Sequence, residues 1–164
     1  MAADHHTDSD GWPTRRLVGM AARLDERRIN RTIAHLGLTK GSLETLETIA
    51  ELRTAKSSEL AALLCVSAQS MGKVVRRLES LGLLTKRRGI DGRTASIELT
   101  QHGVDVMGAA VALVQGLAQP LTDTDPAFRR SLAYRVNDLR SREMERAPPP
   151  GENPDLDGKT GRGA

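Results

Sequence analysis

The sequence predicts a mainly α-helical fold with one small β-hairpin, and three observations predict it. Residues 57–81 contain two short helical segments joined by a tight turn, which is the helix-turn-helix arrangement. The segment 86–100 that follows carries basic residues around Asp91-Gly92 and then an alternating apolar run, as a hairpin does. Longer segments with apolar stripes at helical spacing flank both features, over about 15–36 and 101–146.

Two helices are predicted ahead of the helix-turn-helix. The first runs over about 14–35 and ends at Gly37, because glycine readily takes the left-handed conformation that closes a helix. The second lies within 43–52, where leucine and isoleucine recur at helical spacing. The polar residues 1–14 and the proline-rich residues 147–164 are predicted to be a flexible arm and a disordered tail.

The helix-turn-helix and the hairpin follow in order. A third helix, capped by Ser57 or Ser58, is predicted to reach about Leu64. Ser67 is predicted to cap a fourth helix that Gly82 ends. In the second strand of the hairpin, the apolar residues that alternate with polar ones are Ala95, Ile97 and Leu99.

Two further helices are predicted beyond the hairpin. One covers about Gln101 to Leu121, and the other opens at Asp125-Pro126 and continues to about Arg146, since proline is well tolerated at a first helical position. The prediction is therefore one folded domain over 15–146.

Charge and composition point to a nucleic-acid partner. The 164 residues carry 24 Lys and Arg against 21 Asp and Glu, and most of the positive excess lies between Lys56 and Glu98. Only Trp12, Phe128 and Tyr134 are aromatic, which argues against single-strand binding by base stacking and favours duplex. Cys65 is the only cysteine, and no signal peptide or membrane span is recognisable, so we expect a cytoplasmic protein without a disulfide.

The fourth helix is amphipathic in a way that suits a DNA major groove. The apolar residues that share one face by their spacing are Met71, Val74, Val75, Leu78 and Leu81. A glutamine at this position could read adenine, lysine could reach guanine or phosphate, and helix-start hydroxyls could hold a phosphate. Taken alone, a basic helix face is more often merely solvated, but the helix-turn-helix followed by a basic hairpin favours duplex binding. The candidate residues on this helix are Ser67, Gln69, Ser70, Lys73, Arg76 and Arg77.

The stretch ELAALLCVSAQSMGKVVRRLESLGLLTKRRGIDGRTASIELTQHG resembles the winged helix-turn-helix core of MarR-type bacterial transcription regulators. The matching features are the capping Ser67, Arg77-Leu78-Glu79, Gly82-Leu83-Leu84, Asp91-x-Arg93, and Leu99-Thr100 with Gly103. The resemblance implies a winged helix-turn-helix over about 39–103 and dimerisation helices over about 15–36 and 101–146.

The resemblance also implies roles for residues of the hairpin, or wing. Arg93 would probe a minor groove, whose negative potential attracts a guanidinium, and Asp91 would brace it. Arg87 and Arg88 on the strands would hold phosphates. Two departures from the family pattern are Gly92, where many members carry a second arginine, and Lys73, which is often arginine.

A homodimer is expected because the flanking helices carry more apolar surface than the small winged core can cover. The function implied is a sequence-specific double-stranded-DNA-binding regulator, with repression its expected mode, on a pseudo-palindromic operator and open to release by a small-molecule effector. The alternative is a winged-helix dimerisation or protein-docking module without DNA binding, which would carry a non-basic wing. The apolar stripes are Val104, Met107, Val111, Val114, Leu117 and Leu121, and then Phe128, Leu132, Val136 and Leu139.

Other functions find little support in the sequence. The four histidines show no metal-ligand spacing and no nucleophile–base set is visible, so we expect no enzyme, metal or cofactor. Arg23, Arg27 and His35 are conceivable ligand contacts, although each is better explained as an exposed helix residue. Cys65 is expected to be a small buried hydrophobe rather than a redox sensor.

Overall fold

The structure is a computed structural model, and it describes residues 9, 11–88, 95–117 and 125–146. The chain divides into two compact units at Leu121. The first unit contains the helix-turn-helix and the hairpin, and the second contains the helix that follows Asp125.

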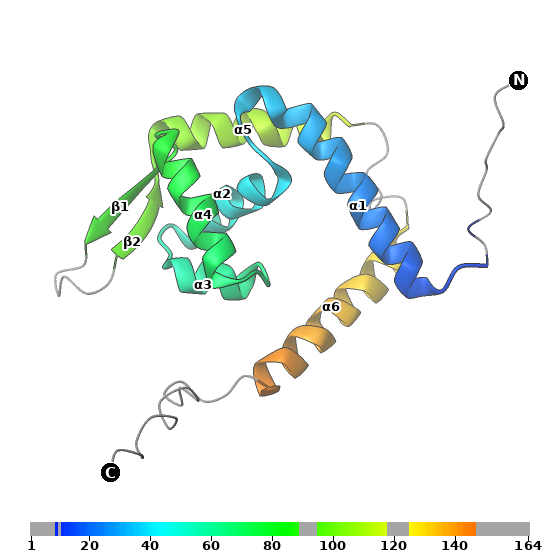
Figure 1. The fold of residues 1–164 in the computed structure, drawn as a ribbon. Helices are drawn as coiled ribbons and strands as arrows, with labels where there is room; N and C mark the ends of the chain where they lie inside the picture. Colours follow the sequence, from blue (N-terminus) through cyan, green and yellow to red (C-terminus); the bar gives the residue numbers. More distant parts are fainter. Residues whose placement is uncertain (1–8, 10, 89–94, 118–124, 147–164) are drawn as a thin grey trace, which may run out of the picture. The chain divides into compact units, whose positions relative to one another are not determined.

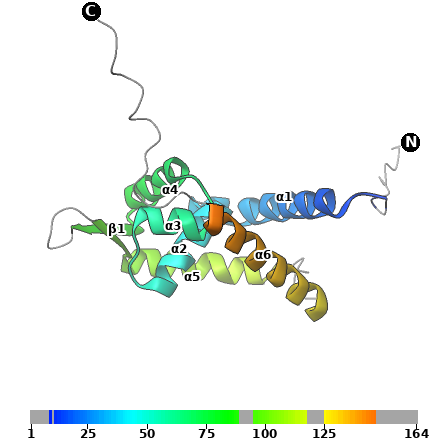
Figure 2. The same ribbon diagram turned by 90° about the horizontal axis from the view of Figure 1, so that it is seen from below.

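The first unit places α2 at its centre. In Figures 1 and 2, α2 lies between α5 on one side and the α3–α4 pair on the other, and the hairpin projects from one end. The helices are α1 (Thr14–Ile33), the 3-10 turn η1 (Ala34–Leu36), α2 (Lys40–Leu52), α3 (Ser57–Leu63), α4 (Ala68–Ser80) and α5 (Gln101–Gln115), and the strands are β1 (Leu84–Arg88) and β2 (Ala95–Leu99).

Hydroxyl side chains start three of these helices. The Oγ1 of Thr39, the Oγ of Ser67 and the Oγ1 of Thr100 each accept a hydrogen bond from the backbone N–H three residues on. Such caps satisfy one of the N–H groups that a helix leaves without an internal partner. The predicted cap at Ser67 is confirmed.

Two glycines close helical segments as predicted. Gly37 and Gly82 have φ angles of 73° and 70°, in the left-handed region that side chains with a Cβ avoid. Gly37 ends η1, and Gly82 follows α4 and leads into β1. Both predictions are confirmed.

Two helix boundaries differ from the sequence prediction. The residue that precedes α3 is Lys56, so neither Ser57 nor Ser58 caps that helix; instead the Glu59 carboxylate accepts a hydrogen bond from the Lys56 backbone N–H at 3.3 Å. The acidic residue at the third helical position thus pairs with the backbone N–H of the residue that precedes the helix. Helix α5 ends at Gln115, six residues before the predicted Leu121, because Gly116 follows with poor helix propensity.

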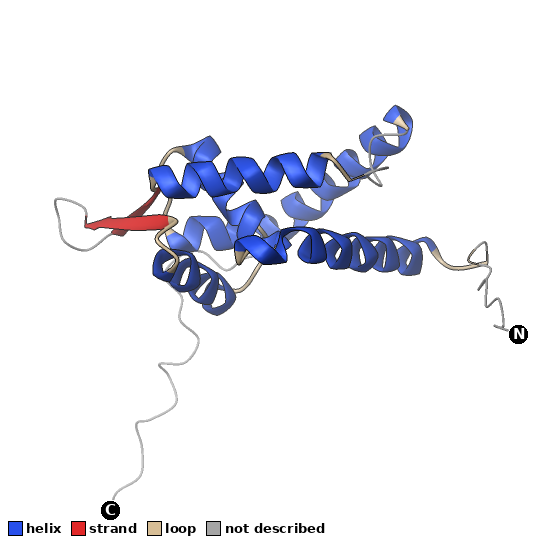
Figure 3. Cartoon of the chain, turned by 90° about the horizontal axis from the view of Figure 1, so that it is seen from above, coloured by secondary structure: helices blue, strands red, loops and turns tan. Residues whose placement is uncertain are grey.

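The hairpin is antiparallel, with Leu84 opposite Leu99 and Arg88 opposite Ala95. Ala55, in the α2–α3 connection, bridges the other edge of β2 through two hydrogen bonds with Ile97, at 3.1 and 2.8 Å. Strand β2 is thus paired on both of its edges, and Figure 3 shows the hairpin projecting from the helices. The predicted Asp91-Gly92 turn lies outside the described residues.

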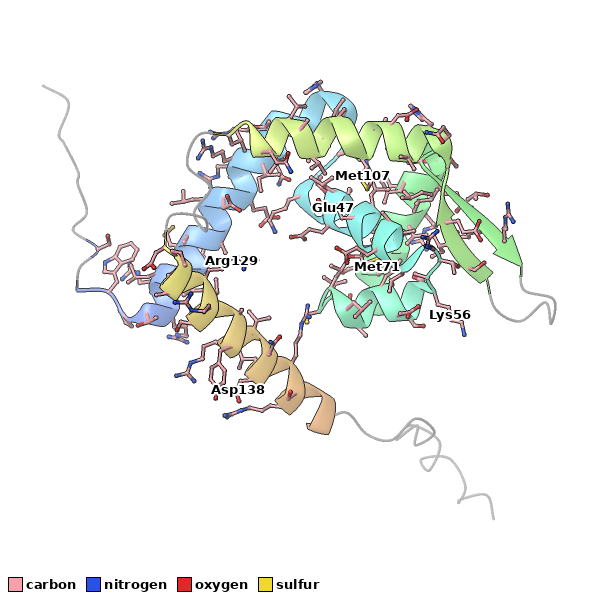
Figure 4. The ribbon with its side chains drawn as sticks, turned by 180° about the vertical axis from the view of Figure 1, so that it is seen from behind. Glu47, Lys56, Met71, Met107, Arg129 and Asp138 are labelled. Carbon is pink, nitrogen blue, oxygen red and sulfur yellow. The ribbon has the colours of Figure 1, made fainter. Side chains whose placement is uncertain are left out.

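The hydrophobic core of the first unit draws on nearly all of its elements. The side chains that are almost fully buried include Ile33 of α1, Leu46 and Ile49 of α2, Leu60 of α3, Leu78 of α4 and Ile97 of β2. In Figure 4, Met107 points from α5 toward α2, which closes the core from the α5 side. Burial of this kind is the main favourable contribution to folding.

The second unit contains α6 (Pro126–Arg146). The Asp125 carboxylate accepts a hydrogen bond from the Ala127 N–H at 2.8 Å, and Asp125 and Pro126 therefore begin this helix as predicted. Phe128, Tyr134 and Leu139 are exposed on it.

Candidate nucleic-acid interface

Helix α4 is anchored to the core by one face. Met71, Val75 and Leu78 are buried, and Figure 4 shows Met71 within the group of helices α2, α3 and α4. Because these three residues recur at helical spacing, the opposite side of the helix, with Lys73 and Arg76, faces solvent. The sequence therefore fixes which side of α4 is available to a partner.

The start of α4 presents two linked hydroxyl groups. Ser67 Oγ accepts a hydrogen bond from the Ser70 N–H at 3.1 Å and donates one to Ser70 Oγ at 2.9 Å. Both residues are exposed. Since Ser67 uses its proton on Ser70, the Ser70 hydroxyl retains a proton that it can donate outward, for example to a phosphate oxygen.

Three of the predicted DNA-contacting side chains stand free on the outer face of α4. Gln69, Lys73 and Arg76 are exposed, and none makes a hydrogen bond or ion pair with another described residue. Two cationic groups and an amide that have no partner among the described residues are suited to contact phosphates and base edges.

Arg77 shares the exposed surface but has a partner. Its Nη2 donates a hydrogen bond to the backbone carbonyl oxygen of Gly37 at 3.2 Å. The two residues are 40 positions apart in the chain, and no sequence pattern signals this contact.

Two basic residues of β1 are paired with carboxylates. Lys86 Nζ lies 2.5 Å from Glu79 Oε2, and Arg87 Nε lies 3.3 Å from Glu98 Oε2. The Arg87 side chain is still 74% exposed, so solvent screens the pair and leaves the guanidinium available to a phosphate. The first pair ties β1 to α4, and the second lies along the hairpin itself.

Sequence reasoning did not assign a role to Glu79 or Glu98. A signal existed for Glu98 alone, because it lies two residues beyond Ser96, the partner of Arg87, and so on the same face of the hairpin. Among the other predicted site residues, the Arg88 side chain, Asp91 and Arg93 lie outside the described part of the structure.

Cys65 is exposed, so the expectation that it is buried is wrong. The residue lies after α3 with a φ of 52°, and this left-handed backbone directs its side chain out of the turn instead of into the core. Its Sγ lies 3.8 Å from the Ala62 carbonyl oxygen. The apolar neighbours in the sequence suggested that Cys65 is buried, but in the turn after α3 its side chain is exposed.

The outer face of α2 is acidic, in contrast to that of α4. Burial raises the pKa of Glu47, and the carboxylates of Glu44 and Glu51 raise it further, while the nearby Lys40 opposes the shift. Lys40 also forms an ion pair with Glu44. Figure 4 shows Glu47 on α2. This face would repel a polyanion such as DNA.

The described residues give little indication of a small-molecule or metal site. Arg23, Arg27 and His35 are exposed, as expected for surface helix residues. No group of three His, Cys, Asp or Glu side chains in the described ranges could hold a metal ion. None of the described helices combines the length and apolar character that a bilayer span needs.

Apolar side chains remain uncovered on the helices predicted to form a dimer. Three of them lie on α1, two on α5 and three on α6, and each is at least one third exposed. A contact with a second chain along these helices would cover them. The residues are Leu17, Val18 and Leu24 of α1, Val104 and Leu113 of α5, and Phe128, Val136 and Leu139 of α6.

Comparisons with known proteins agree with this geometry. The sequence model of the MarR family matches residues 38–93, which contain α2 to the hairpin. The structure is similar to that of a C80S mutant of MarR from E. coli complexed with operator DNA, at 24% identity and a TM-score of 0.67, over 80% of this chain and 96% of that one. No curated protein matches the sequence.

Two further solved structures share the fold. One is the M. tuberculosis transcriptional regulator MOSR in complex with DNA, at 28% identity and a TM-score of 0.67, over 82% of this chain and 99% of that one. The other is the organohalide-sensing transcriptional regulator RdhR in its ligand-free form, at 16% identity and a TM-score of 0.68, over 88% and 89%. The chain is thus similar to the MarR family over residues 38–93, which contain the helix-turn-helix and β1, and it shares its fold with these solved regulators.

Proposed function

We propose that the chain is a homodimeric transcription regulator that binds double-stranded DNA in a sequence-specific manner. The observation that carries the proposal is the outer face of α4, where Gln69, Lys73 and Arg76 are exposed and have no partner among the described residues. A helix of this shape and charge fits the major groove, which displays a distinct pattern of donors and acceptors for each base pair.

The proposed contacts divide into those with base edges and those with the DNA backbone. Gln69 is proposed to pair with adenine and Lys73 to reach guanine or phosphate. Ser67, Ser70, Arg76 and Arg87 are proposed to contact the backbone and to fix the register of the protein on the duplex. Arg88 and Arg93 remain contacts predicted from the sequence, with Asp91 in support.

A dimer would bury the exposed apolar residues of the flanking helices. Its two-fold symmetry would present two copies of α4, about one turn of DNA apart, to a pseudo-palindromic site with half-sites about 10 base pairs apart. Repression by occupation of such a site, in the cytoplasm, with release by a small-molecule effector, is the mode that the family suggests. No catalytic role is proposed.

The experiment is a binding titration of the full chain against two duplexes of about 30 base pairs. One is selected by the protein from a random pool, and the other is of mixed sequence. Fluorescence anisotropy is measured between about 50 and 200 mM salt, and each neutralised phosphate should contribute about −0.9 to the log–log slope. Light scattering supplies the mass of the complex.

We expect the selected duplex to bind a dimer and to bind at least about a thousandfold more tightly than the mixed sequence. Selection of no sequence, with no binding at the lowest salt, would contradict the proposal and would favour the protein-docking module. Binding of a single chain to each duplex would contradict the dimer.

A further inference from the structure

The C-terminal turn of α4 is joined to the turn that ends α1 by two side chains. Arg77 Nη2 donates to the Gly37 carbonyl oxygen at 3.2 Å. Leu81 lies one helical turn further on, and a Cβ at Gly37 would stand 3.8 Å from its Cδ1. The two residues are four positions apart, so they project from the same side of the helix and both reach Gly37.

Gly37 is a well-defined point of attachment. Its φ of 73° is held by a hydrogen bond from its own N–H to the Ala34 carbonyl oxygen at 3.0 Å. The side chains of Ile33 before it and Leu38 after it are buried. The carbonyl that Arg77 contacts therefore belongs to a segment whose direction is fixed by the core on both sides.

The neighbouring arginine provides a comparison within the same helix. Arg76 is also exposed, yet it makes no hydrogen bond or ion pair with another described residue, whereas the guanidinium of Arg77 is committed to a carbonyl. Hydrogen bonds from a charged donor are stronger than neutral ones, and the fork of the guanidinium restricts the direction from which they form. Two adjacent residues of the same type thus have different surroundings.

We infer that Arg77 is a positioning residue, which sets the direction of α4 relative to the α1–α2 turn instead of neutralising a phosphate. The inference rests on the proposed function, in which α1 belongs to the dimer interface and α4 enters the groove. Under that function, the contact with Gly37 couples the dimer helices to the recognition helix. It would then control the distance between half-sites that the dimer accepts.

The test compares Arg77→Gln with the matched variant Arg76→Gln in the full chain. Both remove one exposed positive charge, but only Arg77→Gln removes the charged donor to Gly37. Binding is measured to the duplex that the wild type selects, to the same duplex with one base pair inserted between the half-sites, and to a mixed-sequence duplex. Arg77→Met serves as a second variant, and thermal unfolding verifies that each variant is folded.

We expect Arg77→Gln to lose about tenfold in affinity for the selected duplex, with its salt slope and its affinity for mixed-sequence DNA unchanged. It should also discriminate less than the wild type against the inserted base pair. Arg76→Gln should instead weaken binding to both duplexes and reduce the slope by about one.

Two results would overturn the inference. If Arg77→Gln and Arg77→Met reduce the salt slope and weaken both duplexes as Arg76→Gln does, Arg77 is a phosphate contact, and the proposed function stands without the positioning role. If the wild type selects no duplex at all, the proposed function and the inference fail together.

Discussion

Helices α2 and α4 are alike in construction and opposite in charge. Each has 13 residues, begins at a hydroxyl cap and buries three or more side chains in the same core. A residue in the left-handed conformation lies two positions before each cap, Gly37 before Thr39 and Cys65 before Ser67. Yet the outer face of α2 carries glutamates, and that of α4 carries lysine and arginine.

The comparison separates what builds the fold from what gives it a function. The inner faces and the caps of both helices meet the same kinds of requirement, which are the burial of apolar side chains and the pairing of helix-start N–H groups. The outer faces differ in charge: the basic face of α4 suits a polyanion such as DNA, whereas the acidic face of α2 would repel one.

The largest expected effect concerns the buried inner faces, which α2 and α4 have in common. Leu46 of α2 and Leu78 of α4 are both fully buried. Leu46→Ala and Leu78→Ala should each lower the free energy of unfolding by about 2–5 kcal/mol, since each leaves a cavity as well as losing apolar burial. Urea denaturation at a fixed protein concentration measures both. A large loss for only one of them would show that the helices are not anchored equally.

The next largest effect concerns the outer faces of α2 and α4, which differ in charge. Lys73→Ala should weaken binding to the selected duplex by about 1–3 kcal/mol, as expected for the loss of a groove contact. The matched change on α2, Glu51→Gln, should leave affinity the same or raise it slightly, because it removes a negative charge from the other face. Anisotropy titrations at one salt concentration measure both variants. Equal losses from the two helices would remove the basis for choosing α4.

A third effect concerns the left-handed residue that lies two positions before each cap. Cys65 has a φ of 52°, which glycine adopts without the steric cost that a Cβ brings. Cys65→Gly should therefore raise the free energy of unfolding by about 0.5–1 kcal/mol, and make the start of α4 resemble that of α2 more closely. Thermal and urea unfolding measure this change. Destabilisation would indicate that the Cys65 side chain contributes packing that its exposure does not reveal.

The smallest effect is a pH dependence on α2. The raised pKa of Glu47 means that the folded state holds this proton more tightly than the unfolded state, where the usual value is 4.5. Ionised Glu47 lowers the stability of the folded state. The stability that protonated Glu47 contributes is therefore fully present below pH 4.5 and is lost as the pH rises through the higher pKa of the folded state. Glu47→Gln should thus be more stable than the wild type at neutral pH, by about 0.2–0.5 kcal/mol.

The advantage of Glu47→Gln should disappear as the pH falls below that range, because protonated glutamate and glutamine then carry the same charge. Unfolding curves across the acid range measure the difference between the two proteins. A constant advantage at every pH would mean that the substitution acts through packing, and a disadvantage at neutral pH would contradict the direction of the pKa shift.

Local chemistry made much of this fold predictable from the sequence. Ser67 and Gly82 bound α4 as predicted, because caps and left-handed glycines depend on residues only a few positions apart. The exposed face of α4 followed from the spacing of its buried residues. The predicted serine cap of α3 was wrong: the helix begins after Lys56, and the Glu59 carboxylate accepts the hydrogen bond from the Lys56 N–H.

Contacts between distant parts of the chain could not be predicted. The hydrogen bond from Arg77 to Gly37 depends on how two helices pack, and the pair of Lys86 with Glu79 depends on where β1 lies against α4. The exposure of Cys65 depends on a backbone angle that the apolar neighbours conceal. Each of these is a property of tertiary geometry, which residue types and their spacing do not determine.

The most direct test of the central claim observes α2 and α4 in one experiment. The isotope-labelled protein is titrated with the duplex that it selects, and the backbone amide NMR signals of 68–77 in α4 and 44–51 in α2 are followed. We predict large changes in chemical shift for the α4 amides, strongest near Gln69 and Lys73, with those of the acidic face of α2 nearly unchanged. Shifts concentrated in α2, or none in α4 while the duplex is bound, would contradict the account.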